Sequence, residues 1–183
     1  MELLKTLCSI HAPCGEEKAL TDFLLDYIQE HMKSWSVEPT IHHGDGFQDC
    51  IVLVFGKPRT AIFAHMDSIG FTVKYDNEIV KIGGPVTTEG ITLIGEDSKG
   101  VVQEKIIHKN DEKGNKSLHI GGRAVDRGTS LTFKPYFRET DDYIQCSYMD
   151  NRLGVWNALK VAETLENGII CFSAWEEHGG GSV

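Results

Sequence analysis

The sequence of 183 residues has no apolar run long enough to cross a lipid bilayer, which takes about 18 residues. It has no basic cluster either. Its 27 acidic residues outnumber 18 basic ones, and the net charge of −9 argues against a nucleic-acid surface. The N-terminus carries Glu2 where a signal peptide has a basic residue. We therefore expect a cytoplasmic protein that binds neither nucleic acid nor membrane.

Cysteine pairs with metal-binding or redox spacing are also missing. The five cysteines, Cys8, Cys14, Cys50, Cys146 and Cys171, form no CxxC pair and are odd in number. Three of them, Cys50, Cys146 and Cys171, lie within apolar strand patterns, where a reduced core thiol is the expected state. Neither a disulfide framework nor a cysteine zinc site is expected.

The patterns that are present alternate between helix and strand, as is typical of an α/β protein. Hydrophobic content of 40% and charged content of 25% fit a globular protein with one core or two small domains. The periodicity predicts helices at residues 1–11, 16–32 and 151–166. Buried strands are expected at 50–55, up to His65, at 144–149 and at 169–174, the first two as neighbours.

From about residue 70 to residue 137, short β-patterned runs alternate with Gly, Asp and Asn turns, without a helical period. The expected strands are 71–75, 79–82, 100–108, 117–120 and 130–133. This pattern predicts a small antiparallel barrel or sandwich inserted into the α/β unit. The predicted domains are therefore a discontinuous α/β domain at 1–69 and 138–183, and an inserted β domain at 70–137.

Three of the expected strands end in residues that bind metals or move protons. They are His65 and Asp67 after the first, Asp150 after the second, and Glu176 with Glu177 after the third. Ligands bind at the carboxyl ends of strands in open α/β sheets. An imidazole can bind a metal while the carboxylate two residues later orients it, and adjacent carboxylates can supply a ligand and a general base.

Each motif taken alone also has a structural interpretation. His65 could be satisfied by local hydrogen bonds, Asp150 could cap a helix, and the Glu pair could be solvated. The conjunction of all three at strand ends favours a metal-dependent hydrolase.

The motifs Ala64-His65-Met66-Asp67, Met149-Asp150-Asn151-Arg152-Leu153-Gly154 and Glu176-Glu177 together resemble the glutamyl/tetrahedral-aminopeptidase family of co-catalytic, two-metal metallopeptidases. The resemblance covers the N-terminal portion of that family. It implies a three-layer α/β/α zinc-peptidase-like domain, incomplete in this chain, with an inserted β domain that mediates dimers and larger oligomers. The implied activity is hydrolysis of peptides at a free N-terminus.

Carried over by position, the resemblance also implies a role for each residue. His65 would bind one metal with Asp67 behind it, Asp150 would bridge two metals, and Glu177 would bind the second. Glu176 would be the general base. The cofactors would be two divalent ions, zinc in first place, with cobalt or manganese as substitutes. The peptide bond after Asp150 is expected to be cis.

These residues leave each metal one ligand short of the four that zinc usually takes. The family supplies the missing ligands from later in its chain, so we expect a polypeptide that ends at Val183 to bind metal poorly and to be inactive.

Other functions remain open on the sequence. A two-metal deacylase or carboxypeptidase-like hydrolase would act on blocked or C-terminal substrates. A non-catalytic scaffold would self-associate through the inserted β domain. A serine esterase built on His178-Gly179-Gly180-Gly181 and Ser182 is disfavoured, because in that fold the oxyanion loop and the nucleophile lie far apart in the chain.

Overall fold

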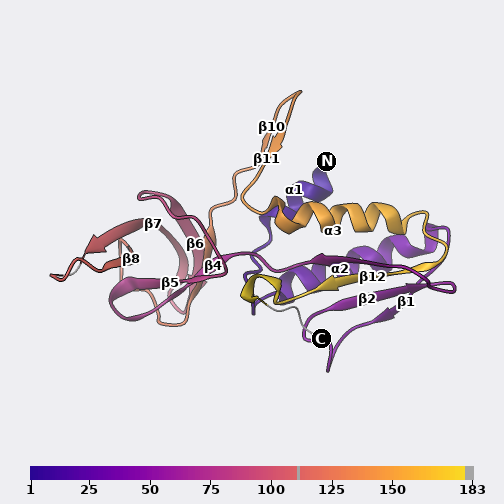
Figure 1. Cartoon of the computed structure of the whole chain (residues 1–183), viewed down its shortest axis with the longest axis horizontal. Coiled ribbons are helices and arrows are strands. Elements are labelled where there is room, and N and C mark those ends of the chain that lie inside the picture. The colour runs from indigo at the N-terminus through magenta and orange to yellow at the C-terminus, as the bar shows by residue number, and fades with distance from the viewer. Residues whose placement is uncertain (111, 180–183) are drawn as a thin grey trace. The chain divides into compact units, whose positions relative to one another are not determined.

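The computed structural model describes residues 1–110 and 112–179 (Figure 1). These residues form two compact units. One comprises Met1–Ser68 together with the chain from Pro135 onward, and the other comprises Ile69–Lys134. The inserted domain expected from the sequence spans 70–137, so the observed unit begins one residue earlier and ends three earlier. No helix in the described ranges is long and apolar enough to span a membrane.

The first unit is an α/β unit built on a four-stranded sheet. Its helices are α1 (Glu2–Ser9), α2 (Lys18–His31) and α3 (Met149–Ala162), with short 3-10 turns at Met32–Ser34 and Glu176–His178. Its strands are β1 (Thr40–His42), β2 (Ile51–Phe55), β3 (Ala61–His65), β10 (Arg138–Glu139), β11 (Ile144–Gln145) and β12 (Gly168–Ser173). The sheet has the order β1-β2-β12-β3, and β10 and β11 form a separate hairpin.

Strand β12 lies between β2 and β3, so the prediction that these two strands are neighbours is wrong. It pairs antiparallel with β2 and parallel with β3, with Ile170 opposite both Leu53 and Ile62. The apolar run of β12, from Ile169 to Phe172, is paired along both edges, which places the strand in the sheet interior. As a result, the C-terminal Glu pair follows a strand that lies directly beside the strand ending at His65.

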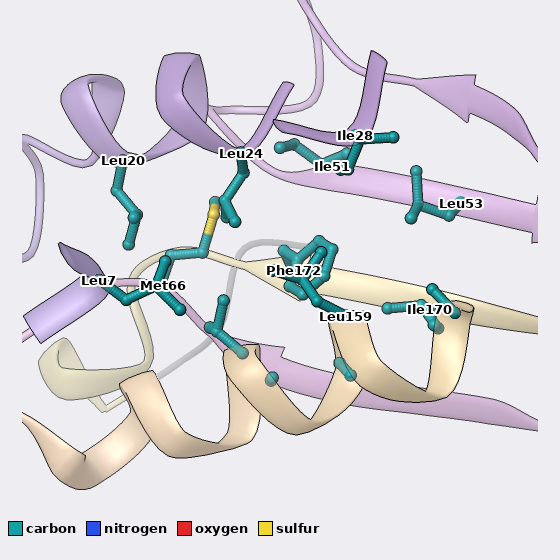
Figure 2. Packing of buried hydrophobic residues seen from close by; sticks show 14 of the residues in the cluster. Leu7, Leu20, Leu24, Ile28, Ile51, Leu53, Met66, Leu159, Ile170 and Phe172 are labelled. Atoms are coloured by element: carbon teal, nitrogen blue, oxygen red, sulfur yellow. The ribbon is translucent and has the colours of Figure 1, made fainter. Parts of the chain in front are cut away.

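The core of this unit lies on one face of the sheet. Ile51, Leu53 and Phe55 alternate with half-buried valines along β2, and the register places Ile170 and Phe172 on the same face. Figure 2 shows these side chains packed with the apolar faces of the helices, among them Leu24 of α2 and Leu159 of α3. Helix formation on this face follows the apolar spacing of α2, whose buried residues are Leu20, Thr21, Leu24 and Ile28.

The opposite face of the sheet is only partly covered by the described residues. Val52 and Cys171 are half-buried there, and Phe63, which pairs with Cys171, is 70% exposed. The described chain thus forms two layers of the expected three-layer α/β/α arrangement. The prediction of an incomplete α/β domain with an inserted antiparallel β unit is confirmed.

The second unit is a closed barrel of six antiparallel strands. They are β4 (Gly70–Val73), β5 (Glu78–Ile82), β6 (Thr92–Asp97), β7 (Gly100–Asn110), β8 (Lys116–Ile120) and β9 (Ser130–Phe133), in the order β4-β5-β8-β7-β6-β9. The barrel has its own apolar core around Phe71, Leu93 and Leu131. Strand β6 was not expected from the sequence. Its Gly95 has no room for a side chain, because a Cβ would collide with the backbone of Ser130 on β9.

The prediction of a buried strand at 144–149 is wrong. Only Ile144–Gln145 is a strand, and it belongs to the β10–β11 hairpin. The helix expected at 151–166 begins earlier and ends earlier, at Met149 and Ala162. The sequence of this segment explains why no buried strand forms. Gln145 and Ser147 interrupt the apolar run, which offers no continuous edge for the sheet to pair with. Asp150 therefore lies in the first turn of a helix and not at the end of a strand.

Candidate metal centre

His65 is held at the end of β3 with both ring nitrogens engaged. Its Nδ1 lies 3.1 Å from the carbonyl oxygen of Asp67, and its Nε2 lies 3.1 Å from Oδ1 of Asp150 and 3.7 Å from Oε2 of Glu176. Only 8% of the residue is exposed. Burial lowers the pKa of the imidazole, but the carboxylates of Asp67, Asp150 and Glu176 outweigh this effect and raise the pKa to about 9.

Asp67 is a fully buried carboxylate that supports the loop after β12. Its two oxygens accept hydrogen bonds from the backbone N–H groups of Glu176 (3.1 Å) and Glu177 (2.8 Å). Burial raises the pKa of this carboxyl, but hydrogen bonds from His65 and these two N–H groups outweigh it, so the pKa lies below its usual value. Asp67 thus connects the imidazole with the Glu pair through its buried carboxylate, in keeping with the position behind His65 that the resemblance implies.

The Glu pair lies on a sharp turn at the end of β12. Trp175 adopts a left-handed backbone conformation (φ 67°), and Glu176–His178 form a single 3-10 turn. The turn directs both carboxylates toward the end of β3, so that donor atoms of His65, Glu176 and Glu177 all lie within 4.8 Å of one another. Burial raises the pKa of Glu177.

Asp150 reaches the same place from the start of α3. Its side chain is 88% exposed, and the peptide bond between Asp150 and Asn151 is cis, as the resemblance implied. Asn151 Oδ1 accepts a hydrogen bond from the N–H of Gly154 at 3.0 Å, in a space that a Cβ at Gly154 would fill. The glycine therefore lets the Asn151 side chain turn back onto the helix.

The structure brings together all five residues that the sequence predicted for the site. His65, Asp67, Glu176 and Glu177 come from the ends of two adjacent strands, and Asp150 comes from a helix start far away in sequence. One imidazole and three carboxylates that converge in this way fit a zinc, cobalt or manganese ion. Three other histidines have different surroundings: His42 and His43 are exposed, and His119 bonds to Ser117 and Asp76 in the barrel unit. Ser182 lies outside the described residues.

The sequence analysis missed Glu17. Its carboxylate is fully buried and accepts hydrogen bonds from the N–H groups of Gly15 (3.0 Å) and Trp175 (3.2 Å). It also lies beside Cys14 and Asp67 in a compact buried group. Burial raises the pKa of Glu17. Two buried carboxylates, Glu17 and Asp67, thus hold three successive N–H groups of the turn that carries the Glu pair. A Glu beside Glu16 at the start of a helix gave no signal of this in the sequence.

Glu17→Gln is expected to lower the free energy of unfolding by about 1–3 kcal/mol, because the amide has one acceptor oxygen for two buried N–H groups. Urea unfolding measures the change. Glu16→Gln is the matched control, since the Glu16 side chain is about half exposed (54%). Equal losses in the two variants would contradict the role of Glu17.

Both the sequence and the fold of this chain resemble those of known proteins. Residues 51–182 match the M42 glutamyl aminopeptidase family. No curated protein matches the sequence at a significant level. Similar folds include an aminopeptidase from the archaeon Desulfurococcus kamchatkensis, with 22% identity and a TM-score of 0.75 over 97% of this chain and 56% of that one.

Two further solved structures have the same fold. The Pyrococcus horikoshii TET1 peptidase, described as assembling into a tetrahedron or a large octahedral shell, has 20% identity and a TM-score of 0.70, over 97% of this chain and 62% of that chain. A Thermotoga maritima protein described as an endoglucanase has 16% identity and a TM-score of 0.68, over 93% and 58% of the two chains. This chain therefore spans less than two thirds of the length of these structures. By the family match over most of its length, the chain belongs to the M42 glutamyl aminopeptidase family.

Proposed function

We propose that this chain carries part of the active site of a metal-dependent aminopeptidase, a hydrolase that removes N-terminal residues from peptides. The observation that carries the proposal is the convergence of His65, Asp150, Glu176 and Glu177 at one end of the sheet. Membership of the M42 family supports the same reaction class.

The proposed cofactors are two divalent ions, with zinc as the first choice. His65 would hold one ion, Glu177 the other, and Asp150 would bridge them. Asp150 is suited to bridging because its exposed carboxylate already lies 3.1 Å from His65 Nε2. Bound divalent ions would act as Lewis acids on the scissile carbonyl.

The residues of the chain would then divide the work of proton transfer and positioning. Glu176 is 57% exposed, so its carboxylate can reach a water molecule, take its proton and pass it to the leaving amine. Asp67 would keep His65 in one orientation and hold the backbone beneath the Glu pair. A free substrate amine would lie against the carboxylates of the site, which accounts for action at the N-terminus.

The substrate class is tested by comparing aminoacyl p-nitroanilides with their N-acetylated analogues, after incubation with zinc, cobalt or manganese. In a protein that holds the complete set of metal ligands, we expect hydrolysis of the free-amine compound at least tenfold faster, and loss of that hydrolysis after chelation and in Glu176→Gln. Preference for the acetylated compound would replace this proposal with the deacylase or carboxypeptidase-like alternative. Turnover that survives chelation would exclude a metal-dependent site altogether.

We also propose that the chain self-associates through its barrel unit. Related structures include a peptidase dodecamer, and the barrel exposes Val80, Val86 and Val101. Light scattering after size-exclusion chromatography is expected to give a mass above that of one 20.4 kDa chain, with or without chelator. A monomer at all concentrations would contradict this part of the proposal, and an oligomer without turnover would favour the non-catalytic scaffold. All five cysteines lie in the described part of the chain and none forms a disulfide, which suits the cytoplasm, where we expect the protein to work.

A further inference from the structure

A pocket of about 410 Å³ opens beside the turn that carries the Glu pair. It is lined by Gly15, Gln48, Asp49 and Trp175, all of them residues of the α/β unit, and we call it the Trp175 pocket. Trp175 directly precedes Glu176 in the chain. The pocket therefore begins one residue away from the proposed general base.

Hydrogen bonds fix the walls of the Trp175 pocket to each other. The N–H of Ala174 donates to Sγ of Cys50 at 3.3 Å, which joins the residue before Trp175 to the residue after Asp49. The hydroxyl of Thr21 on α2 donates to the carbonyl oxygen of Asp49 at 2.8 Å. The loop that carries Asp49 and the turn that carries Trp175 are thus held together by the fold.

All four residues that line this pocket have a left-handed backbone conformation. The angle φ is 92° at Gly15, 48° at Gln48, 65° at Asp49 and 67° at Trp175. Residues with a side chain rarely adopt this conformation, and those that do cluster at ligand sites. Gly15 lies against the indole, because a Cβ at Gly15 would be 3.6 Å from Cη2 of Trp175.

Asp49 gives the Trp175 pocket a half-buried carboxylate. This carboxylate accepts no hydrogen bond and forms no ion pair with any residue that the structure describes. The ammonium group of Lys18 acts on it electrostatically, but both carboxylate oxygens of Asp22 hold that group at 2.8 Å. The Asp49 carboxylate is therefore available to a cation that enters the pocket.

Trp175 gives the same pocket an aromatic wall. The residue is 39% exposed, and its ring centroid lies 5.9 Å from that of His178 at a tilt of 49°. The face of an indole attracts cations, and the planar guanidinium group stacks on it. A carboxylate and an indole that line one pocket suit a cationic side chain with an apolar stem.

A second pocket of about 480 Å³ continues from the first, because Gln48 and Asp49 line both. The charged side chains of the two pockets together are those of Lys18, Asp22, Asp45 and Asp49, with His43 as a further titratable group. Carboxylates thus outnumber ammonium groups along this surface, which favours a positively charged ligand.

We propose that the Trp175 pocket is the subsite for a basic side chain at the N-terminus of the substrate, with arginine preferred to lysine. The inference rests on the proposed peptidase function. The guanidinium group would stack on the indole of Trp175 and pair with the carboxylate of Asp49, while the free amine lies at the Glu pair. An uncharged side chain of the same shape would lose both interactions.

The test is an NMR titration of the full chain, without added metal, with L-argininamide. The matched ligand is L-citrullinamide, which has nearly the same shape but no charge on its side chain. The indole N–H signal of Trp175 is identified by its loss in Trp175→Asn, since asparagine tolerates the left-handed backbone. We expect argininamide to shift this signal saturably and to bind about tenfold more tightly than citrullinamide. The signal of Trp35, which is 8% exposed, should not move.

Asp49→Asn removes the charge of the pocket and keeps a residue that tolerates the φ of 65°. It should weaken the binding of argininamide about tenfold and leave the binding of citrullinamide unchanged. The control is Asp26→Asn, an exposed aspartate of α2 that is not among the residues lining either pocket. Asp26→Asn should bind both amides as the unaltered chain does.

Equal affinity of the unaltered chain for the two amides would overturn the proposal, even where Asp49→Asn does not fold. So would unchanged binding of argininamide in a folded Asp49→Asn. Because the titration needs neither metal nor turnover, either result leaves the proposed peptidase reaction standing. If argininamide binds as expected but no peptide is hydrolysed, the peptidase function fails and the pocket remains a site for cations.

Discussion

Asp67→Asn is expected to lower the zinc affinity of the site by about ten- to a hundredfold, the usual cost of losing a residue that orients metal ligands. The Asp67 carboxylate is fully buried and lies 3.5 Å from Nδ1 of His65 while it accepts the N–H groups of Glu176 and Glu177. An asparagine keeps the size but turns an NH₂ group toward one of these donors. The imidazole and both carboxylates then lose a common support. Competition with a chromophoric zinc chelator measures the affinity.

The control for this variant is Asp142→Asn, an exposed aspartate in the turn between β10 and β11. It should leave the zinc affinity unchanged. If Asp67→Asn and Asp142→Asn bind zinc equally well, Asp67 does not position the ligands.

Arg152→Ala is expected to lower the free energy of unfolding by about 3–5 kcal/mol, through a cavity and two carbonyl groups that lose their donor. Arg152 is fully buried. Its Nε donates to the carbonyl of Leu7 at 3.1 Å, and its Nη2 donates to that of Ile10 at 3.5 Å, so it joins the start of α3 to the end of α1. Urea unfolding measures the loss.

Burial of the charged Arg152 guanidinium also destabilises the folded state, and a second variant measures this effect. Its Nη1 has no hydrogen-bond partner among the described residues, and burial lowers the pKa of the guanidinium to about 10. Arg152→Met fills most of the volume without a buried charge, so we expect it to lose less stability than Arg152→Ala. Arg59→Ala, at an exposed turn, is the control. A change within about 0.5 kcal/mol for Arg152→Ala would contradict this account.

The site was predictable from local sequence because its residues follow short apolar runs. His65 and the Glu pair both lie directly after strands whose residues are apolar at successive positions, and these strands were identified correctly. Asp150 was also identified, but for a partly wrong reason. The segment before it is not a buried strand, and the residue reaches the site from a helix start.

Long-range pairing was not visible in the sequence. Local patterns indicate which residues form strands, but the insertion of β12 between β2 and β3 depends on which edges find partners across more than a hundred residues. The role of Glu17 could not be predicted for a related reason. Its burial is created by Trp175 and Asp67, which lie far away in the chain, and nothing in its local pattern distinguishes it from the exposed Glu16.

In the barrel unit, too, local sequence patterns predicted most strands but not one that depends on a distant neighbour. Five of its strands were expected approximately where they occur, because alternation and turn residues marked them. Strand β6 was missed, since Gly95 interrupts its pattern and is explained only by the close approach of β9.

We propose above all that His65, Asp150 and the Glu pair form a divalent metal site. Isothermal titration calorimetry of the chain with zinc tests this most directly. The account predicts weak but saturable binding that is lost in His65→Ala and kept in His43→Ala, whose histidine is exposed in a loop of the same unit. No binding by the unaltered chain, or the same affinity in all three proteins, would contradict it.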